Sequence, residues 1–234
     1  MADWFQEMRD DLWLPPDEQG KEEAGFIKRA LKLRRGHRVL DIPCGAGRIA
    51  VHLAQAGCDV TGADLRRPFV ARARKRFRAA GVGGSFAVLD MRKIDWCSEF
   101  HAIYNWGGSF GYFDDEENAD LILRFGRALR RGGRLMVEQL NRERILRRFM
   151  REVATEKRVS HNRWNRRRQR VESSYFVNGV HDARDRSSMR LYTPCQMRVL
   201  FERAGLRVES LYGDLQGNPY TRLGQELIVV GRKE

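Results

Sequence analysis

Residues 39–50 constrain the fold of this chain more than any other stretch of its sequence. They read Val-Leu-Asp-Ile-Pro-Cys-Gly-Ala-Gly-Arg-Ile-Ala, an apolar segment that ends at an acid and enters a glycine-rich turn. Gly45 and Gly47 leave the backbone bare, so a ligand can lie against main-chain amides where the next helix begins. The same letters fit the G-x-G-x-x-A fingerprint of dinucleotide sites. The stretch therefore predicts a strand, a turn and a helix from Arg48 to Ala56 that hold a nucleotide-like ligand.

Two later segments repeat the pattern of a strand that ends at an acid. Residues 58–64 close on Asp64, and residues 85–90 close on Asp90, with Met91 directly after it. Open α/β sheets bind ligands at the carboxyl ends of their strands, where an acid after the second strand accepts hydrogen bonds from ribose hydroxyls. We expect Asp64 to have that role and Met91 to pack on an adenine face.

The position of Asp41 separates two kinds of nucleotide-binding protein. A dinucleotide dehydrogenase usually begins its glycine turn directly at the strand end, whereas Asp41 stands four residues before the first bare glycine. Further along, residues 129–137 read Leu-Arg-Arg-Gly-Gly-Arg-Leu-Met-Val, which predicts a helix end, a Gly-Gly turn and a fifth strand. From about Ala24 to Val230 the chain resembles the class I S-adenosylmethionine-dependent methyltransferases. Their signatures are a "VLDxGCGxGR" turn, acids ending strands two and three, and a "LxPGGxLxxx" turn into strand five.

This resemblance implies a fold, a cofactor and a set of contacts. The fold is α/β, a Rossmann-like seven-stranded mixed sheet with the last strand antiparallel and helices on both faces. The cofactor is S-adenosyl-L-methionine, which leaves as S-adenosyl-L-homocysteine. Pro43 stands where the family usually has a glycine, so close approach must rely on Gly45 and Gly47. The residues implied to bind the cofactor are Asp41, Pro43, Cys44, Gly45, Ala46, Gly47, Arg48, Asp64, Leu65, Asp90, Met91, Asn105 and Trp106.

Length and composition agree with a single methyltransferase domain over residues 1–234. At 42% hydrophobic the chain can bury a core, and no apolar run approaches the roughly 18 residues of a membrane span, so no membrane partner is expected. The first residues lack the basic and apolar regions of a secretory signal, and the four cysteines are scattered. We expect a cytoplasmic protein with reduced thiols. The five histidines show no metal-ligand spacing, so we expect no metal.

Two segments are additions to the expected sheet. Trp4, Phe5, Met8 and Leu12 fall at helical spacing, which predicts a helical lid over residues 1–34, broken at the Pro15-Pro16 pair. Residues 156–192 alternate sparse apolar and polar side chains around Asn178-Gly179, a hairpin signal. They predict an antiparallel β-flap over the acceptor site, with strands near 157–164, 170–178 and 180–192. A homodimer formed through the β-flap is left open.

The positive charge raises nucleic acid as a competing partner. The net charge is +13, and residues 165–170, Asn-Arg-Arg-Arg-Gln-Arg, carry its densest cluster. Aromatic residues do not interleave with this run as stacking platforms would. Strand four reads Ala-Ile-Tyr-Asn-Trp-Gly-Gly at 102–108, whereas methyltransferases of base amino groups typically end it with Asp/Asn-Pro-Pro-aromatic. Nucleic acid is therefore disfavoured, and an RNA or protein methyltransferase that docks through the basic flap is the alternative.

The loop after strand four is similar to that of small-molecule N-methyltransferases, including antibiotic-sugar N,N-dimethyltransferases. Residues 108–113 read Gly-Ser-Phe-Gly-Tyr-Phe, and in the sugar enzymes the loop runs close to "SSIGHL". Tyr112 takes the place of the histidine thought to position or deprotonate the amine. Tyr112 is therefore the leading candidate for the catalytic residue. His181 on the flap and Tyr104 are further candidates.

The sequence thus predicts methyl transfer from S-adenosylmethionine to a small-molecule acceptor, an amine or a hydroxyl. Arginines of the flap, including Arg184, Arg186 and Arg190, would suit an anionic acceptor because guanidinium groups bind carboxylates and phosphates bidentately. A non-catalytic S-adenosylmethionine-binding protein and a dinucleotide oxidoreductase remain as alternatives.

Overall fold

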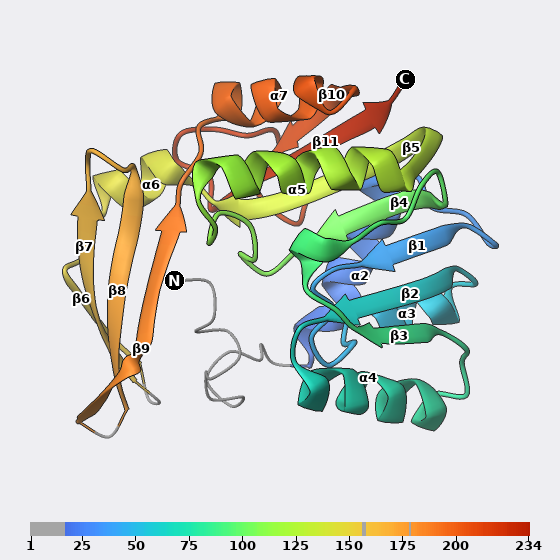
Figure 1. Ribbon diagram of the computed structural model, residues 1–234, viewed down its shortest axis with the longest axis horizontal. Coiled ribbons are helices and arrows are strands. Elements are labelled where there is room, and N and C mark those ends of the chain that lie inside the picture. Colours follow the sequence, from blue (N-terminus) through green and yellow to red (C-terminus); the bar gives the residue numbers. More distant parts are fainter. Residues whose placement is uncertain (1–16, 156–157, 178) are drawn as a thin grey trace.

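The computed structural model describes residues 17–155, 158–177 and 179–234, without the side chains of residues 181–185. Its main body is a seven-stranded sheet with helices on both faces (Figure 1). The strand order is β10-β11-β5-β4-β1-β2-β3. The strands are β1 (Arg38–Asp41), β2 (Asp59–Asp64), β3 (Ser85–Val88), β4 (Phe100–Asn105), β5 (Leu129–Leu140), β10 (Leu206–Tyr212) and β11 (Glu226–Lys233).

The pairing gives the mixed topology that the sequence predicts. β1 pairs in parallel with β2 and β4, β2 with β3, and β4 with β5. The last strand, β11, is antiparallel to both of its neighbours, β5 and β10. The parallel strands therefore present their carboxyl ends at one edge, where such sheets bind ligands. The predicted fold class is confirmed.

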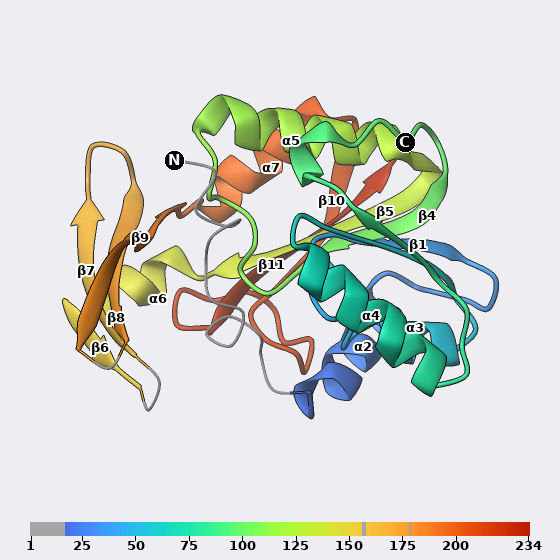
Figure 2. The same cartoon turned by 60° about the horizontal axis from the view of Figure 1, so that its bottom comes forward.

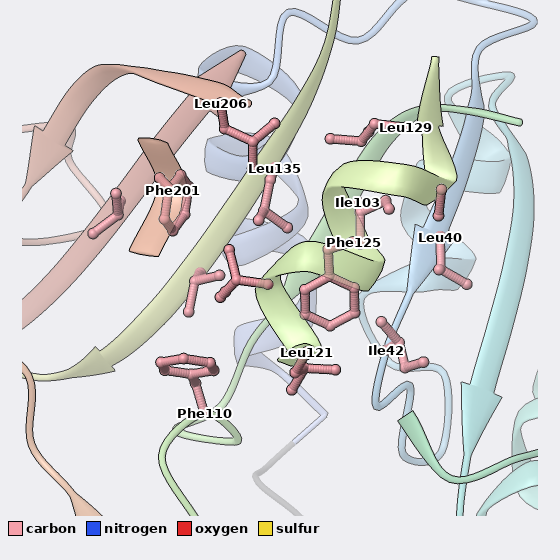
Figure 3. Close-up of a cluster of buried hydrophobic side chains, with 14 of the residues drawn as sticks. Leu40, Ile42, Ile103, Phe110, Leu121, Phe125, Leu129, Leu135, Phe201 and Leu206 are labelled. Carbon is pink, nitrogen blue, oxygen red and sulfur yellow. The ribbon is translucent and has the colours of Figure 1, made fainter. Parts of the chain in front are cut away.

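Helices cover both faces of the sheet because successive residues of each strand point to opposite faces. The α-helices within the described residues are α2 (Gln19–Ala30), α3 (Ala50–Gln55), α4 (Arg67–Ala79), α5 (Asp115–Ala128), α6 (Arg142–Arg147) and α7 (Pro194–Arg203). Leu40 packs with residues of α5 and α7 in one core cluster, and its neighbour Val39 packs with residues of α2 and α3 in the other. Figure 3 shows the first cluster, with Phe125 of α5 and Phe201 of α7 facing the sheet.

Two helices begin with capping boxes that the sequence encodes. Asp114 accepts the N–H of Glu117 at 2.8 Å at the start of α5, and Thr193 accepts that of Gln196 at 3.3 Å at the start of α7. In each box the side chain of the third helical residue also accepts the backbone N–H of the capping residue. N–H groups at the start of the helix that have no partner within it are thereby hydrogen-bonded. The α5 cap also fixes where the loop after β4 ends, beside the candidate site.

The inserted segment forms a separate antiparallel sheet of four strands, β6-β7-β8-β9. They are β6 (Glu152–Ala154), β7 (Val159–Asn165), β8 (Arg170–Val177) and β9 (Val180–Arg190). The last three confirm the predicted strands, whereas β6 was not predicted because its three residues carry no apolar alternation. Figures 1 and 2 both show this sheet beside the main body, next to α6, with β9 leading to α7.

Several predicted boundaries need correction. The helix after the glycine turn begins at Ala50 rather than Arg48, because Gly45 and Gly47 hold positive φ and extend the turn. β5 begins at Leu129, so the predicted Gly-Gly turn lies within this strand. There it is an irregularity in the pairing with β4, because Leu129 pairs with Phe100 and Arg134 already pairs with Ala102. Of the predicted lid, Trp4, Phe5, Met8 and Leu12 lie outside the described residues, and its second helix is α2. The lid role stays a prediction.

Candidate active site

A pocket of about 650 Å³ opens at the carboxyl ends of the parallel strands. Its walls come from the turn after β1, the ends of β2 and β3, one face of α4 and the loop after β4. Most of the residues predicted to bind a cofactor line it: Asp41, Pro43, Cys44, Gly45, Ala46, Arg48, Asp64, Leu65, Asp90, Met91 and Trp106. Sequence segments up to 96 residues apart thus meet at one cavity, since Asp17 and Phe113 both line it.

Asp64, the last residue of β2, is one of the acids that line this pocket. It is 6% exposed, and its carboxylate accepts the backbone N–H of Gly45 at 2.9 Å and that of Arg66 at 2.8 Å. Burial raises the pKa of Asp64, and these two N–H donors and the charge of Arg66 oppose the rise. Each oxygen accepts one of these hydrogen bonds and keeps a further lone pair, so the carboxylate can accept two hydroxyl donors from a ligand.

Asp41 lies deeper, at the end of β1. Burial raises the pKa of Asp41 to about 8; the Tyr104 hydroxyl and Arg48 oppose the rise, and the Asp64 carboxylate adds to it. At neutral pH most Asp41 side chains therefore carry a proton. A cationic ligand in the pocket would favour the ionised form.

Asp90 and Met91 stand side by side after β3, with different surroundings. Arg92 pairs with the Asp90 carboxylate at 2.6 Å, and its N–H donates to the same carboxylate at 2.9 Å. Burial alone would raise the pKa of Asp90, but the hydrogen bonds and charge of Arg92 hold it below its usual range. The Arg92 guanidinium also lies 4.6 Å from the ring centroid of Phe113, another pocket residue. Asp90 is thus a fixed anion, and Met91 supplies apolar surface beside it.

A buried network that the sequence did not predict supports the floor of the pocket. Glu23 of α2 binds Arg48 through both carboxylate oxygens, the longer contact being 3.0 Å, and accepts the indole N–H of Trp106 at 3.2 Å. Glu23 and Arg48 are 7% and 9% exposed, so each buried charge has the other as its partner. No local pattern marks Glu23, because its partners lie 25 and 83 residues away in the sequence.

Gly47 and Asn105 were predicted to bind the cofactor but do not line the pocket. A Cβ on Gly47 would lie 3.0 Å from that of Ala73, so the missing side chain lets α4 pack against the turn. Asn105 is fully buried and donates from Nδ2 to the carbonyl of Ile42 at 2.7 Å, which ties β4 to the turn after β1. Both residues shape the pocket from behind.

The three predicted catalytic residues have different surroundings. Tyr112 lines the pocket, on the loop after β4. Tyr104 is fully buried in the core cluster beneath α2 and α3 and does not line the pocket. His181 belongs to β9, and its side chain lies outside the described part of the chain. Burial, together with Tyr175 and Glu138, raises the pKa of Tyr112, so its hydroxyl stays protonated at neutral pH.

Glu138 of β5 is a buried acid that the sequence analysis missed. Its carboxylate accepts the N–H of Gly108 at 2.7 Å, and the N–H of Gly107 also donates to it. Burial and the adjacent carboxyl of Glu226 raise the pKa of Glu138 to about 8, so the two carboxyls hold a proton between them at neutral pH. Gly107 and Gly108 line the pocket, and Glu138 supports them from behind. The rule that identified Asp41 and Asp64, an acid near a strand's carboxyl end, also applies to Glu138.

The basic turn at 166–169 borders a second cavity, of about 710 Å³, which shares Tyr112 and Phe113 with the first. Arg167 and Arg168 line it together with Asp114, Asp115 and Glu117, at the start of α5. Of the flap arginines, Arg190 is 6% exposed and pairs with Asp115 at 3.2 Å, Arg186 is exposed, and the Arg184 side chain lies outside the described residues. The densest positive charge of the chain thus faces acids of the same chain.

Within the described residues, no three His, Cys, Asp or Glu side chains are grouped so that they could hold a metal ion. None of the helices described has the length and apolar character needed to cross a membrane.

Comparison with known proteins finds methyltransferases that are similar to part of this sequence. Residues 39–133 match the family model of a methyltransferase domain. The chain is 31% identical over 153 residues to a glycine/sarcosine N-methyltransferase of Halorhodospira halochloris, a match that covers 62% of this chain and 55% of that protein. The chain thus spans about half the length of this curated relative.

Solved structures share the fold over almost the whole chain. The CcbJ methyltransferase from Streptomyces caelestis superposes with a TM-score of 0.79 at 17% identity, covering 96% of this chain and 95% of that one. CalS10, an S-adenosylmethionine-bound amino pentose methyltransferase from Micromonospora echinaspora, gives 0.64 at 22% identity, covering 93% and 91%. The match of residues 39–133 to a methyltransferase domain, together with the shared fold, supports a class I S-adenosylmethionine-dependent methyltransferase.

Proposed function

We propose that this protein transfers the methyl group of S-adenosylmethionine to the amino nitrogen of a small molecule. The observation that carries the proposal is the convergence of Asp41, Asp64 and Tyr112 on one pocket, which the strand-end acids and the loop after β4 line together. Two of the similar proteins bear names that point the same way: a glycine/sarcosine N-methyltransferase and an amino pentose methyltransferase.

The residues present suit this cofactor. The Asp64 carboxylate would accept hydrogen bonds from the two ribose hydroxyls. The apolar surface for the adenine ring would come from Leu65, Leu89 and Met91. Asp41 and Arg48 would face the charged methionine end. A Cβ on Gly107, which lines the pocket, would meet nothing within 4 Å, so the missing side chain leaves that space to a ligand.

When bound, S-adenosylmethionine supplies an electrophilic methyl carbon on its sulfonium. The chain must therefore hold an acceptor lone pair in line with that carbon, and such positioning is worth about 7–11 kcal/mol. Tyr112 keeps its proton at neutral pH, so we assign it the role of orienting the amine through its hydroxyl rather than ionising. Glu138, held behind Gly107 and Gly108, orients the backbone that lines the pocket beside Tyr112.

A methyl-transfer screen tests this proposal. The purified protein is incubated with S-adenosylmethionine carrying a labelled methyl group and with a panel of amino acids, amino sugars and other small amines. We expect label on the nitrogen of at least one amine and a matching amount of S-adenosylhomocysteine. A matched panel of alcohols distinguishes O-methylation. Label transfer to RNA or protein alone would overturn the proposal, and cofactor binding without transfer to any panel member would favour a non-catalytic protein.

The net charge of +13 is the observation that favours RNA as the substrate. It is weakened because Arg167 and Arg168 share a cavity with Asp114, Asp115 and Glu117, which lower the local potential for a polyanion. We therefore place the small amine first.

A further inference from the structure

Arg170, the first residue of β8, connects the inserted sheet to the loop after β4. Its guanidinium donates to three successive carbonyls of that loop: Gly111 at 2.9 Å, Tyr112 at 3.0 Å and Phe113 at 2.9 Å. It also donates to the carbonyl and the hydroxyl of Ser188, on β9, each at 2.8 Å. Every hydrogen bond of this guanidinium within the described residues therefore ends on the loop or on the adjacent strand.

A second contact joins the same two segments through the backbone. The N–H of Arg190, which pairs with Arg170 in the sheet register, donates to the carbonyl of Gly111 at 2.7 Å. Gly111 has φ +100, and a Cβ placed on it would overlap the carbonyl oxygen of Arg190. The end of β9 therefore lies directly against the loop, with no side chain between them.

The chemistry of arginine suits this position and that of lysine does not. A guanidinium presents five N–H donors in one rigid plane, so it can serve several carbonyls at once. An ammonium offers three donors around one point and lacks the lateral reach of the fork. Arg170 is only partly exposed, whereas Arg166, Arg167 and Arg168 beside it in the sequence are exposed. Arg170 therefore differs in role from the other arginines of the basic turn.

The loop that Arg170 holds is part of the pocket. Tyr112 and Phe113 line the main pocket and also the second cavity, which Arg170 lines too. The two cavities thus share Tyr112 and Phe113, whose carbonyls the guanidinium binds. A shift of this loop would move Tyr112 relative to the rest of the pocket, while Asp64 and Gly45 would stay in place because they belong to other segments.

We propose that Arg170 is a positioning residue, which fixes the Gly111–Phe113 backbone and thereby sets where Tyr112 meets the acceptor. The inserted sheet is then a fixed part of the acceptor site at this end. The role in turnover rests on the proposed function, and the control of the loop does not.

The first test measures the loop directly. Hydrogen–deuterium exchange of the peptide covering residues 107–114 is compared in wild type, Arg170→Lys, Arg170→Ala and a control, Arg163→Ala. Arg163 lies on the same sheet, with a 76% exposed side chain that pairs with Glu172. We expect faster exchange in both Arg170 variants, no change in the control and no change in the peptide covering 39–47.

Unchanged loop exchange in Arg170→Ala would overturn the proposal, whether or not an acceptor is known. If Arg170→Ala does not fold, the same comparison rests on Arg170→Lys.

The second test measures turnover with the amine that accepts label in the screen. S-adenosylhomocysteine affinity should stay within about twofold of wild type, while kcat/KM for the amine falls by about 10²-fold, the loss typical of an ångström-scale misplacement. In a double-mutant cycle, Tyr112→Phe should cost much less in the Arg170→Ala background than in wild type, because the hydroxyl is already misplaced. Additive losses would show that Arg170 does not act through Tyr112 and would overturn that part. If no amine accepts label, the proposed function fails, while the exchange result still decides whether Arg170 holds the loop.

Discussion

The Asp64 carboxylate, at the end of β2, accepts the backbone N–H of Gly45 from the turn after β1 at 2.9 Å. This hydrogen bond joins the two elements that the family pattern treats as separate signatures. The acid thus fixes the glycine turn and also faces the pocket with its remaining lone pairs. Replacing Asp64 should therefore affect ligand binding in two ways, through the lost acceptor and through a less ordered turn.

Asp64→Ala should weaken binding of both S-adenosylmethionine and S-adenosylhomocysteine by about 1.5–3 kcal/mol, the range for hydrogen bonds to a charged group. Titration calorimetry measures both affinities. Asp59→Asn is the matched control, because Asp59 lies at the exposed opposite end of the same strand. Equal affinities in Asp64→Ala and wild type would show that this carboxylate does not contact the ligand.

The strand-end acids were predictable because their positions follow from the chain itself. An apolar run that stops at an acid reads the same whatever packs around it, so Asp41 and Asp64 could be assigned to one edge of the sheet. The alternation of Val39 and Leu40 between the two faces of the sheet was predictable too, because side chains of any strand alternate in this way. Glu138 obeys this rule too and could have been found with it.

Other parts of the site depend on contacts that no local pattern records. Glu23 gains its role from Arg48 and Trp106, and Arg170 gains its role from carbonyls 57 to 59 residues away. A run of arginines has the same sequence whether its members are solvated or docked. For this reason the sequence alone groups Arg170 with the charged turn, whereas the structure separates it from its neighbours.

The two glycines of the turn should respond differently to substitution. Gly45 lines the pocket, so Gly45→Val should abolish detectable ligand binding by filling the space of the ligand, and the positive φ of Gly45 adds backbone strain. Gly47 packs against Ala73 at φ +72, so Gly47→Ala should lower the free energy of unfolding by about 1–3 kcal/mol through backbone strain and crowding. Thermal unfolding without ligand and calorimetry with S-adenosylhomocysteine separate the two effects. A Gly47→Ala protein as stable as wild type would contradict the packing role.

Ligand binding should release a proton from Asp41. The pKa of Asp41 is about 8 in the protein without ligand, so the side chain is mostly protonated at pH 7. The sulfonium and ammonium charges of S-adenosylmethionine would favour the carboxylate and expel that proton. Calorimetry at pH 7 in phosphate and in Tris should give binding enthalpies that differ in proportion to the protons released. The difference should be smaller for S-adenosylhomocysteine, which lacks the sulfonium charge, and should vanish in Asp41→Asn. Equal enthalpies in both buffers for the wild type would refute the linkage.

Stability should fall as the pH rises through the range where Glu138 titrates. Its pKa is raised from 4.5 to about 8, so between these values the folded protein binds more protons than the unfolded chain. The protonated pair therefore contributes its full stability below about pH 4.5 and loses it as the pH approaches 8, with a slope of up to about 1.4 kcal/mol per pH unit. Glu138→Gln keeps an acceptor for the Gly108 N–H and should flatten this slope relative to wild type. Urea unfolding at half-unit steps from pH 5 to 8.5 measures it, and parallel curves for the two proteins would contradict the assignment.

The basic turn offers a test between the two substrate classes, provided that Arg170 is left intact. Arg166, Arg167 and Arg168 are exposed, whereas a variant that also removed Arg170 would disturb the Gly111–Phe113 loop and confuse docking with catalysis. If these three arginines bound RNA phosphates, their joint replacement by glutamine would weaken RNA binding and reduce the slope of log affinity against log salt by about 0.7 for each lost contact.

We expect instead that turnover of the small amine persists in the triple variant. Wild type should show little RNA affinity at physiological salt, because Asp114, Asp115 and Glu117 line the same cavity as Arg167 and Arg168. Filter binding across a salt series with a single-stranded RNA measures the affinity. Tight binding by wild type that is lost in the triple variant would give the RNA methyltransferase first place.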